Sequence, residues 1–173
     1  MKTRRFSCLI FILTIVLSFT SCGGPDFEKV YEDVKEEVSQ MKQKDKLSYH
    51  PQNSFKGNCK LSDDKNKIII EDSYNEKGYG GRTDMLIAIA VSESFEAAKD
   101  FSKMFIDKLE MSEGIYEEIK EALSSKTQKS GSANDNGVKV SWETTGFALD
   151  TDKIKSEGRI DINASYRIVF EKD

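Results

Sequence analysis

The sequence predicts an α+β fold: an antiparallel sheet of about four to five strands with helices packed on one face, preceded by an N-terminal amphipathic helix. Two observations lead to this class. Apolar residues recur at steps of three and four within 27–41 and 95–123, which is helical spacing. They recur at every second position within 138–142 and 160–170, which indicates strands with one wet and one dry face.

The first expected helix follows Asp26, whose side chain suits an N-cap. Its apolar residues form one stripe and its opposite face is charged and solvated. The stripe is expected to pack on its own domain, with a partner helix as the alternative. Residues 42–54, including Pro51, break the period and predict a loop. The stripe consists of Phe27, Val30, Tyr31, Val34, Val38 and Met41.

The next segments predict strands and a loop. Residues 67–72 are rich in β-branched side chains and predict a strand, and 55–61 predict a weaker one, joined to it by a turn at 63–66. Residues 73–82 contain three glycines and predict a polar loop. Residues 84–92 are apolar without a period, which favours a central strand covered on both sides.

Two further helices are expected. The first is capped by Ser92 or Ser94 and carries a stripe that ends at Leu109, and the second is capped by Ser112. Residues 124–136 are small and polar and predict a loop. The stripe of the first helix contains Phe95, Ala98, Phe101, Phe105 and Leu109, and the second buries Ile115, Ile119 and Leu123 or Ala122.

Two strands end the sequence. Val138 and Val140 alternate with polar residues, and Trp142 continues their row, so its indole is expected in the core. The last strand can pair with this one antiparallel, through a connection at 149–158. Its expected inward row is Ile160, Ile162, Ala164, Tyr166, Ile168 and Phe170, and its outward row is Asp161, Asn163, Ser165, Arg167 and Glu171.

The first two dozen residues have the order of an export signal. Basic residues at 2–5 precede an apolar run at 6–19, which is too short for the ~20 residues of a membrane-spanning helix. The segment Phe19-Thr20-Ser21-Cys22 then resembles a bacterial lipobox, with Phe19 where the usual motif has leucine. The resemblance implies that Cys22 is acylated and becomes the N-terminus after cleavage. An ordinary secretory signal and an uncleaved anchor are the alternatives.

This resemblance sets the expected domain organisation and location. Residues 1–21 are a lipoprotein signal peptide, 22–25 are the lipidated cysteine and a short tether, and 26–173 are a single α+β domain. Gly23 follows the cysteine in place of the aspartate that marks inner-membrane retention in some bacteria. The resemblance therefore implies a lipid anchor in a bacterial cell envelope, in the outer membrane rather than the inner. No family is recognised in the mature domain.

The charge balance excludes one class of partner. Without residues 1–21 the chain keeps 23 basic and 30 acidic residues, a net charge of −7. Polyanions repel such a chain, so nucleic acid is not an expected partner, and attachment to a membrane has to come from acyl chains at Cys22.

The sequence offers few residues for catalysis or metal binding. Its one histidine, His50, lies in a polar loop, and Cys59 is the single cysteine of the mature domain. A Cys/His zinc set is therefore excluded, and no cofactor or metal is expected. Cys59 is either a small buried residue or a free thiol that can pair between chains.

Four acidic or glycine-rich motifs have simpler interpretations than a catalytic or ligand-binding role. The adjacent carboxylates Asp63-Asp64 and Glu71-Asp72 lie in turn and strand-end contexts, although paired carboxylates could support glycoside hydrolysis. The sequence Gly78-Tyr79-Gly80-Gly81 lacks the lysine of a P-loop. Asn134-Asp135-Asn136-Gly137 is too short for a calcium loop and predicts a turn. No catalytic residue is assigned.

These observations favour a lipid-anchored, non-catalytic envelope protein that binds or scaffolds another envelope component. The alternative is a carrier or chaperone that holds an apolar ligand between sheet and helices, since 84–109 are rich in Phe, Met and Ile. A hydrolase working through carboxylates is a third hypothesis, which requires two acidic groups about 5 to 10 Å apart across a pocket.

Overall fold

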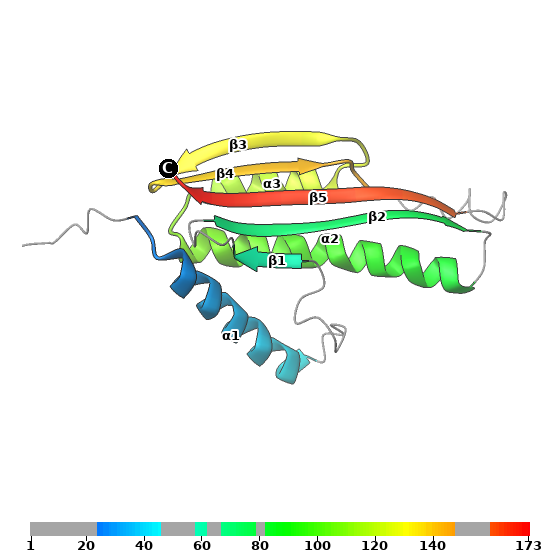
Figure 1. The fold of residues 1–173 in the computed structure, drawn as a ribbon, viewed down its shortest axis with the longest axis horizontal. Coiled ribbons are helices and arrows are strands. Elements are labelled where there is room, and N and C mark those ends of the chain that lie inside the picture. The colour runs from blue at the N-terminus through cyan, green and yellow to red at the C-terminus, as the bar shows by residue number, and fades with distance from the viewer. Residues whose placement is uncertain (1–23, 46–57, 62–66, 79–81, 148–159) are drawn as a thin grey trace, which may run out of the picture.

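The computed structural model describes residues 24–45, 58–61, 67–78, 82–147 and 160–173. Within them one antiparallel sheet of five strands has the order β1-β2-β5-β4-β3. Helices α2 and α3 lie along one side of it, and α1 lies beside the end formed by β1 (Figure 1). The elements are α1 (Phe27–Asp45), β1 (Asn58–Leu61), β2 (Lys67–Gly78), α2 (Arg82–Lys108), α3 (Glu113–Ser124), β3 (Lys129–Asp135), β4 (Val138–Thr144) and β5 (Ile160–Lys172). The predicted α+β class is confirmed.

Strand β5 is the centre of the sheet and has the alternation that its sequence predicts. It pairs with β2 from Lys67 opposite Glu171 to Gly78 opposite Ile160, and with β4 on its other side. Asn163 and Arg167 are exposed, and Ser165 is half-buried. The side chains of Ile160 and Asp161 lie outside the described residues. The inward row is buried and consists of Ile162, Ala164, Tyr166, Ile168 and Phe170.

Helix α1 packs its apolar stripe on its own domain, which is the first of the two arrangements expected for it. The Asp26 carboxylate accepts a hydrogen bond from Lys29 N at 3.1 Å and so caps the helix. Glu37 forms an ion pair of 3.3 Å with Lys108 at the end of α2. The buried stripe is Phe27, Val30, Val34 and Val38.

The strand predicted at 84–92 is wrong, because these residues form the first part of helix α2. An apolar run without a period cannot be assigned to strand or helix from spacing alone. The segment continues into the strongly helical 93–108, and a helix that is already nucleated extends at small cost per residue. Ser92 and Ser94 therefore lie inside the helix and do not cap it. The aromatic stripe of its second half is core, as predicted.

Helix α3 begins after Ser112, as predicted, but the Ser112 hydroxyl makes no capping hydrogen bond. Its backbone N–H instead donates to Asp135 Oδ2 at 2.6 Å, which fixes the start of the helix to the end of β3. The inner side of α3 is the predicted one, with Ile115, Ile119, Ala122 and Leu123 buried.

Two of the predicted loops are wrong, because backbone pairing extends into polar sequence. Strand β2 continues to Gly78 because its second half pairs with Ile160–Ser165 of β5. Residues 129–135, which were expected in a loop, form the edge strand β3. An edge strand is half exposed and does not need an apolar row. The other strand predicted in the N-terminal half, 55–61, is present as β1 at 58–61.

The turn predicted at 134–137 is present and joins β3 to β4. Asn136 and Gly137 have φ angles of 49° and 70°, which is the left-handed pair of a type I′ hairpin. Trp142 faces inward as predicted, and its indole lies against Gly131 of β3. A methyl group at Gly131 would lie 2.4 Å from Trp142 Cζ2, so the glycine leaves room for the indole.

Candidate functional site

The face of the sheet opposite the helices carries its charged side chains in rows that cross the strands. Arg167 of β5 lies between Glu71 of β2 and Glu143 of β4, and its guanidinium is 3.1 Å from the Glu71 carboxylate. Alternation along each strand keeps this face wet. Arg167 was predicted to be exposed, whereas Glu143 was not recognised as part of a site.

A second charged row crosses the same face nearer the C-terminus. Glu171 is 3.0 Å from Lys67 and 3.2 Å from Lys139, on the two neighbouring strands. Hydrogen bonds from Lys67 and then Lys139 lower the pKa of the Glu171 carboxyl. Ile69 and Val169 lie opposite each other between the two rows. The first row thus has a cation between two anions, and the second row has an anion between two cations.

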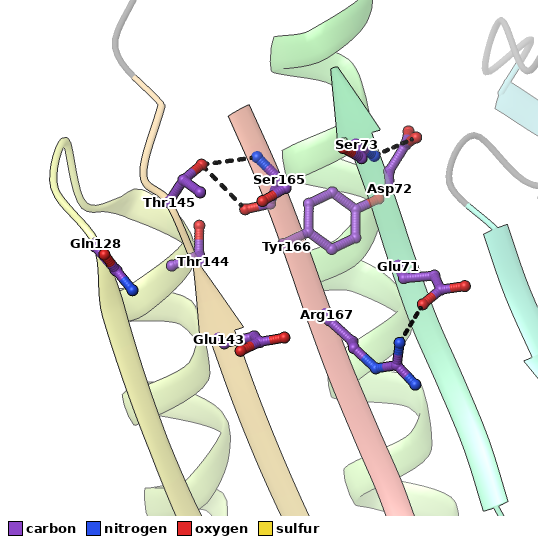
Figure 2. A pocket seen from close by; sticks show the side chains of 10 residues that line it. All are labelled: Glu71, Asp72, Ser73, Gln128, Glu143, Thr144, Thr145, Ser165, Tyr166 and Arg167. Atoms are coloured by element: carbon purple, nitrogen blue, oxygen red, sulfur yellow. Dashed lines mark hydrogen bonds and ion pairs between the residues drawn. The ribbon is translucent and has the colours of Figure 1, made fainter. Parts of the chain in front are cut away.

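A shallow hollow of about 390 Å³ lies at the row formed by Glu71, Arg167 and Glu143. It extends to the end of β4, where Thr145 N donates to Ser165 O at 3.0 Å and Thr145 Oγ1 accepts from Ser165 N at 2.8 Å. Figure 2 shows Arg167 directed toward Glu71, with Thr145 beside Ser165 at the other end. The hollow is lined by Glu71, Asp72, Ser73, Gln128, Glu143, Thr144, Thr145, Ser165, Tyr166 and Arg167.

The chain leaves β4 through Gly146, which directly follows the lining residue Thr145 and lies against the backbone of Lys126 and Thr127. Gly146 has a φ of 81°, and its N–H donates to the Thr144 hydroxyl at 3.0 Å. Phe147 N then donates to Ser125 O at 3.1 Å, so the segment after β4 is fixed to the segment after α3.

A buried polar cluster lies on the helix side of the sheet, behind the hollow. Ser94 of α2 donates from its hydroxyl to Asp72 Oδ2 at 2.7 Å and lies 2.8 Å from the Tyr166 hydroxyl. Tyr74 donates to the same Asp72 oxygen at 2.6 Å. Burial, followed by the hydrogen bond to Asp72, raises the pKa of Tyr74 to about 12. The Tyr166 ring packs edge-on against Phe95 at 5.0 Å.

This cluster joins helix to sheet and is not arranged for nucleophilic catalysis. Ser94 is 1% exposed, and its hydroxyl contacts the Asp72 carboxylate and the Tyr166 phenol rather than a histidine base. Asp72 faces the helices whereas its neighbour Glu71 is ion-paired on the open face, so the adjacent pair is divided between the two sides. A buried, fully hydrogen-bonded network of this kind stabilises the specific packing of helix on sheet.

A second hollow, of about 290 Å³, lies between α2, α3 and the segment after β4. Its walls include Phe95 and Phe147, whose rings are 5.6 Å apart, together with Glu96 and Lys99, which form an ion pair of 2.7 Å. These side chains are engaged with one another and present no convergent set of polar groups.

Several residues considered from the sequence lie outside the described residues: Cys22, His50, Asp63-Asp64 and 79–81. Cys59 lies in β1 opposite Ile70, and its side chain is outside the described part. Among the residues that the structure describes, no three His, Cys, Asp or Glu side chains gather as metal ligands. None of the described helices is both long and apolar enough to span a membrane.

Comparison with known proteins found no matching family model, no similar curated protein and no similar solved structure.

Proposed function

We propose that the chain is a lipid-anchored protein of a bacterial cell envelope, without a catalytic role, that binds another envelope protein through the open face of its sheet. The observation that carries the proposal is the row formed by Glu71, Arg167 and Glu143, whose charged side chains line a hollow of about 390 Å³. A face with fixed rows of both signs favours specific recognition over nonspecific adsorption.

The composition of the hollow favours a polypeptide with basic or hydrogen-bonding side chains. Two carboxylates, from Glu71 and Glu143, line it on the open face against one guanidinium from Arg167, while the Asp72 carboxylate lies on the helix side. Hydroxyls of Ser73 and Thr145 line it too and are exposed. Charged groups at the rim of such a surface contribute to the rate of encounter and to the choice of partner.

The placement of the first described residues supports an anchor at the end of the sheet. A methyl group at Gly24 would lie 3.2 Å from Lys172 Cε and 3.8 Å from Gly137 O. The chain therefore enters the fold beside the β3–β4 turn and the end of β5. Cys22 precedes Gly24 by two residues, and two residues of extended chain span at most about 7 Å from the Gly24 Cα atom. Acyl chains there would hold this end near an outer membrane.

The site favours a surface role over the alternative of an apolar ligand held between sheet and helices. Phe101, Phe105 and Phe170 are each at most 1% exposed, and the Phe105 and Phe170 rings pack at 5.8 Å. Both hollows described above open to solvent and carry charged side chains.

Replacing Cys22 with alanine tests the anchor. The variant should accumulate as an unprocessed precursor without acyl label, because the Cys22 thiol is the nucleophile of the modification. Metabolic labelling with a palmitate analogue and a mobility assay measure this. A Cys22→Ala chain that is still cleaved and still labelled contradicts the anchor.

Reversing a charge at the hollow tests the binding face. A photo-crosslinking residue at Ser73, which is exposed and lines the hollow, should yield one discrete adduct in the native cell. Adding Glu143→Lys should reduce that adduct at least about tenfold, since unpaired like charges at an interface cost several kcal/mol. Glu118→Lys, the same charge change on the exposed side of α3, is the matched control and should leave it unchanged.

The adduct partner is then identified by mass spectrometry and tagged in turn, and it must capture this chain reciprocally. An equal loss of the adduct in both variants indicates a nonspecific electrostatic effect and contradicts a binding site at the hollow. No discrete adduct at Ser73, with folded protein present in the envelope, contradicts it as well.

A further inference from the structure

The outer edge of β3 is open in the part of the molecule that the structure describes. Strand β3 is the last strand of the sheet and forms its upper margin in Figure 1, with β4 on one side and no described strand on the other. Ser130, Ser132 and Asn134 are exposed. The strand pairs with β4 in continuous register over all seven residues, so no bulge turns the edge away.

The hydrogen-bonding direction of each β3 residue follows from the ladder. Thr145 N donates to Ser165 O, so the odd-numbered residues of β4 and its extension bond to β5 and the even-numbered ones bond to β3. The type I′ turn at Asn136-Gly137 gives the same parity, with Asp135 and Val138 as the bonded pair that closes the hairpin. The backbone groups of Ser130, Ser132 and Asn134 therefore point outward.

The sequence of this edge is complementary to itself when reversed. Strand β3 reads Lys129-Ser130-Gly131-Ser132-Ala133-Asn134-Asp135, with a cation at its first residue and an anion at its last. An antiparallel pair of two such strands centred on Ser132 places Lys129 of each copy opposite Asp135 of the other. Ser130 then lies opposite Asn134, and the small residues Gly131 and Ala133 lie opposite each other.

We propose that β3 pairs with β3 of a second copy of this chain, antiparallel and centred on Ser132, which joins two sheets into one. In this register each residue whose backbone N–H and C=O point outward lies opposite another such residue. Ser130 of one copy exchanges both N–H···O bonds with Asn134 of the other, and the two Ser132 residues exchange both bonds with each other. The charged ends meet at the positions where side chains approach most closely. Asp135 gives one carboxylate oxygen to Ser112 N, and its other oxygen can accept Lys129 of the second copy.

The middle of this edge lacks the devices that proteins use to prevent such pairing. Proline, bulges and inward-pointing charges in the middle of a strand block edge-to-edge association. The five residues between Lys129 and Asp135 are uncharged and include no proline. The opposite edge of the sheet is β1, which has only four residues. The pairing does not depend on the proposed function, because it uses the edge of the sheet and not its open face.

Proline at position 132 is the first test. The Ser132 N–H points outward, so proline there removes a donor of the intermolecular ladder and no hydrogen bond within the chain. Two differently tagged copies of the full chain are co-expressed and isolated in mild detergent under reducing conditions, so that Cys59 cannot link them. Wild-type copies should co-isolate, Ser132→Pro should reduce co-isolation at least about tenfold, and Ser132→Ala, which keeps the N–H, should not.

Exchanging the end charges is the second test and remains decisive if the proline variant does not fold. Lys129→Glu and Asp135→Lys should each fail to pair with themselves, because both ends then carry like charges. A mixture of the two should pair with each other, because each contact again joins opposite signs. Wild-type copies that stay monomeric, a folded Ser132→Pro chain that pairs fully, or charge variants that self-pair as wild type does would each overturn the proposal.

Discussion

Replacing Ile162 with aspartate is expected to destabilise the domain by several kcal/mol. Ile162 lies in the inward row of β5 and is 4% exposed, so the variant removes a packed side chain and puts an unpaired charge in its place. Asn163 is the neighbouring residue on the exposed side, and Asn163→Asp should change the free energy of unfolding by less than about 0.5 kcal/mol.

Denaturant midpoints of the two purified variants measure the contrast. Comparable losses in both would mean that the sheet is buried on its two faces, which contradicts an open face with a hollow at Arg167. A stable Ile162→Asp chain would place the apolar row of β5 at the surface and would move the candidate binding surface to that side.

Replacing Gly146 with alanine should be nearly as damaging, for a reason of backbone geometry. Gly146 has a φ of 81°, and a methyl group there would lie 2.6 Å from Thr127 N and 2.7 Å from the Lys126 carbonyl carbon. The left-handed backbone costs alanine about 1–2 kcal/mol, and overpacking against backbone atoms that cannot rotate away adds about 1–3 kcal/mol.

Gly137→Ala is the matched control for Gly146→Ala. Gly137 also has a positive φ, of 70°, but nothing lies within 4 Å of an added methyl group. The free energy of unfolding of Gly137→Ala should fall only by the cost of a left-handed backbone at alanine, about 1–2 kcal/mol. The difference between the two melting or denaturant curves therefore isolates the contact between the segment after β4 and that after α3. Equal losses in the two variants would mean that the contact between Gly146 and the segment after α3 is loose.

The residues predicted best from the sequence are those whose burial pattern repeats over a whole element. The inward row of β5, the stripe of α1 and the inner side of α3 each follow a period of two or 3.6 over several turns or pleats. The turn at 134–137 is predicted because Asn, Asp and Gly favour turns, and the structure places the left-handed pair Asn136-Gly137 there. Such features depend on local geometry, which the sequence carries by itself.

The candidate site could be predicted only in part. Arg167 was expected on an exposed face, but its neighbours Glu71 and Glu143 come from strands far apart in the sequence. Their position beside Arg167 depends on the strand order and the register, which no local pattern encodes. Thr145 joins the site because its backbone continues the β4–β5 ladder beyond β4.

The sequence alone therefore determined the α+β class, the faces of α1, α3 and β5, and the presence of a turn at 134–137. The tertiary structure decided three other points. Residues 84–92 became helix because they extend α2, and the polar 129–135 became a strand because β4 supplied a register for its backbone groups. The charges of three strands meet on one face because of the same pairing. Pairing satisfies main-chain hydrogen bonds whatever the side chains are. A segment without a pattern of its own therefore takes its structure from the strands beside it.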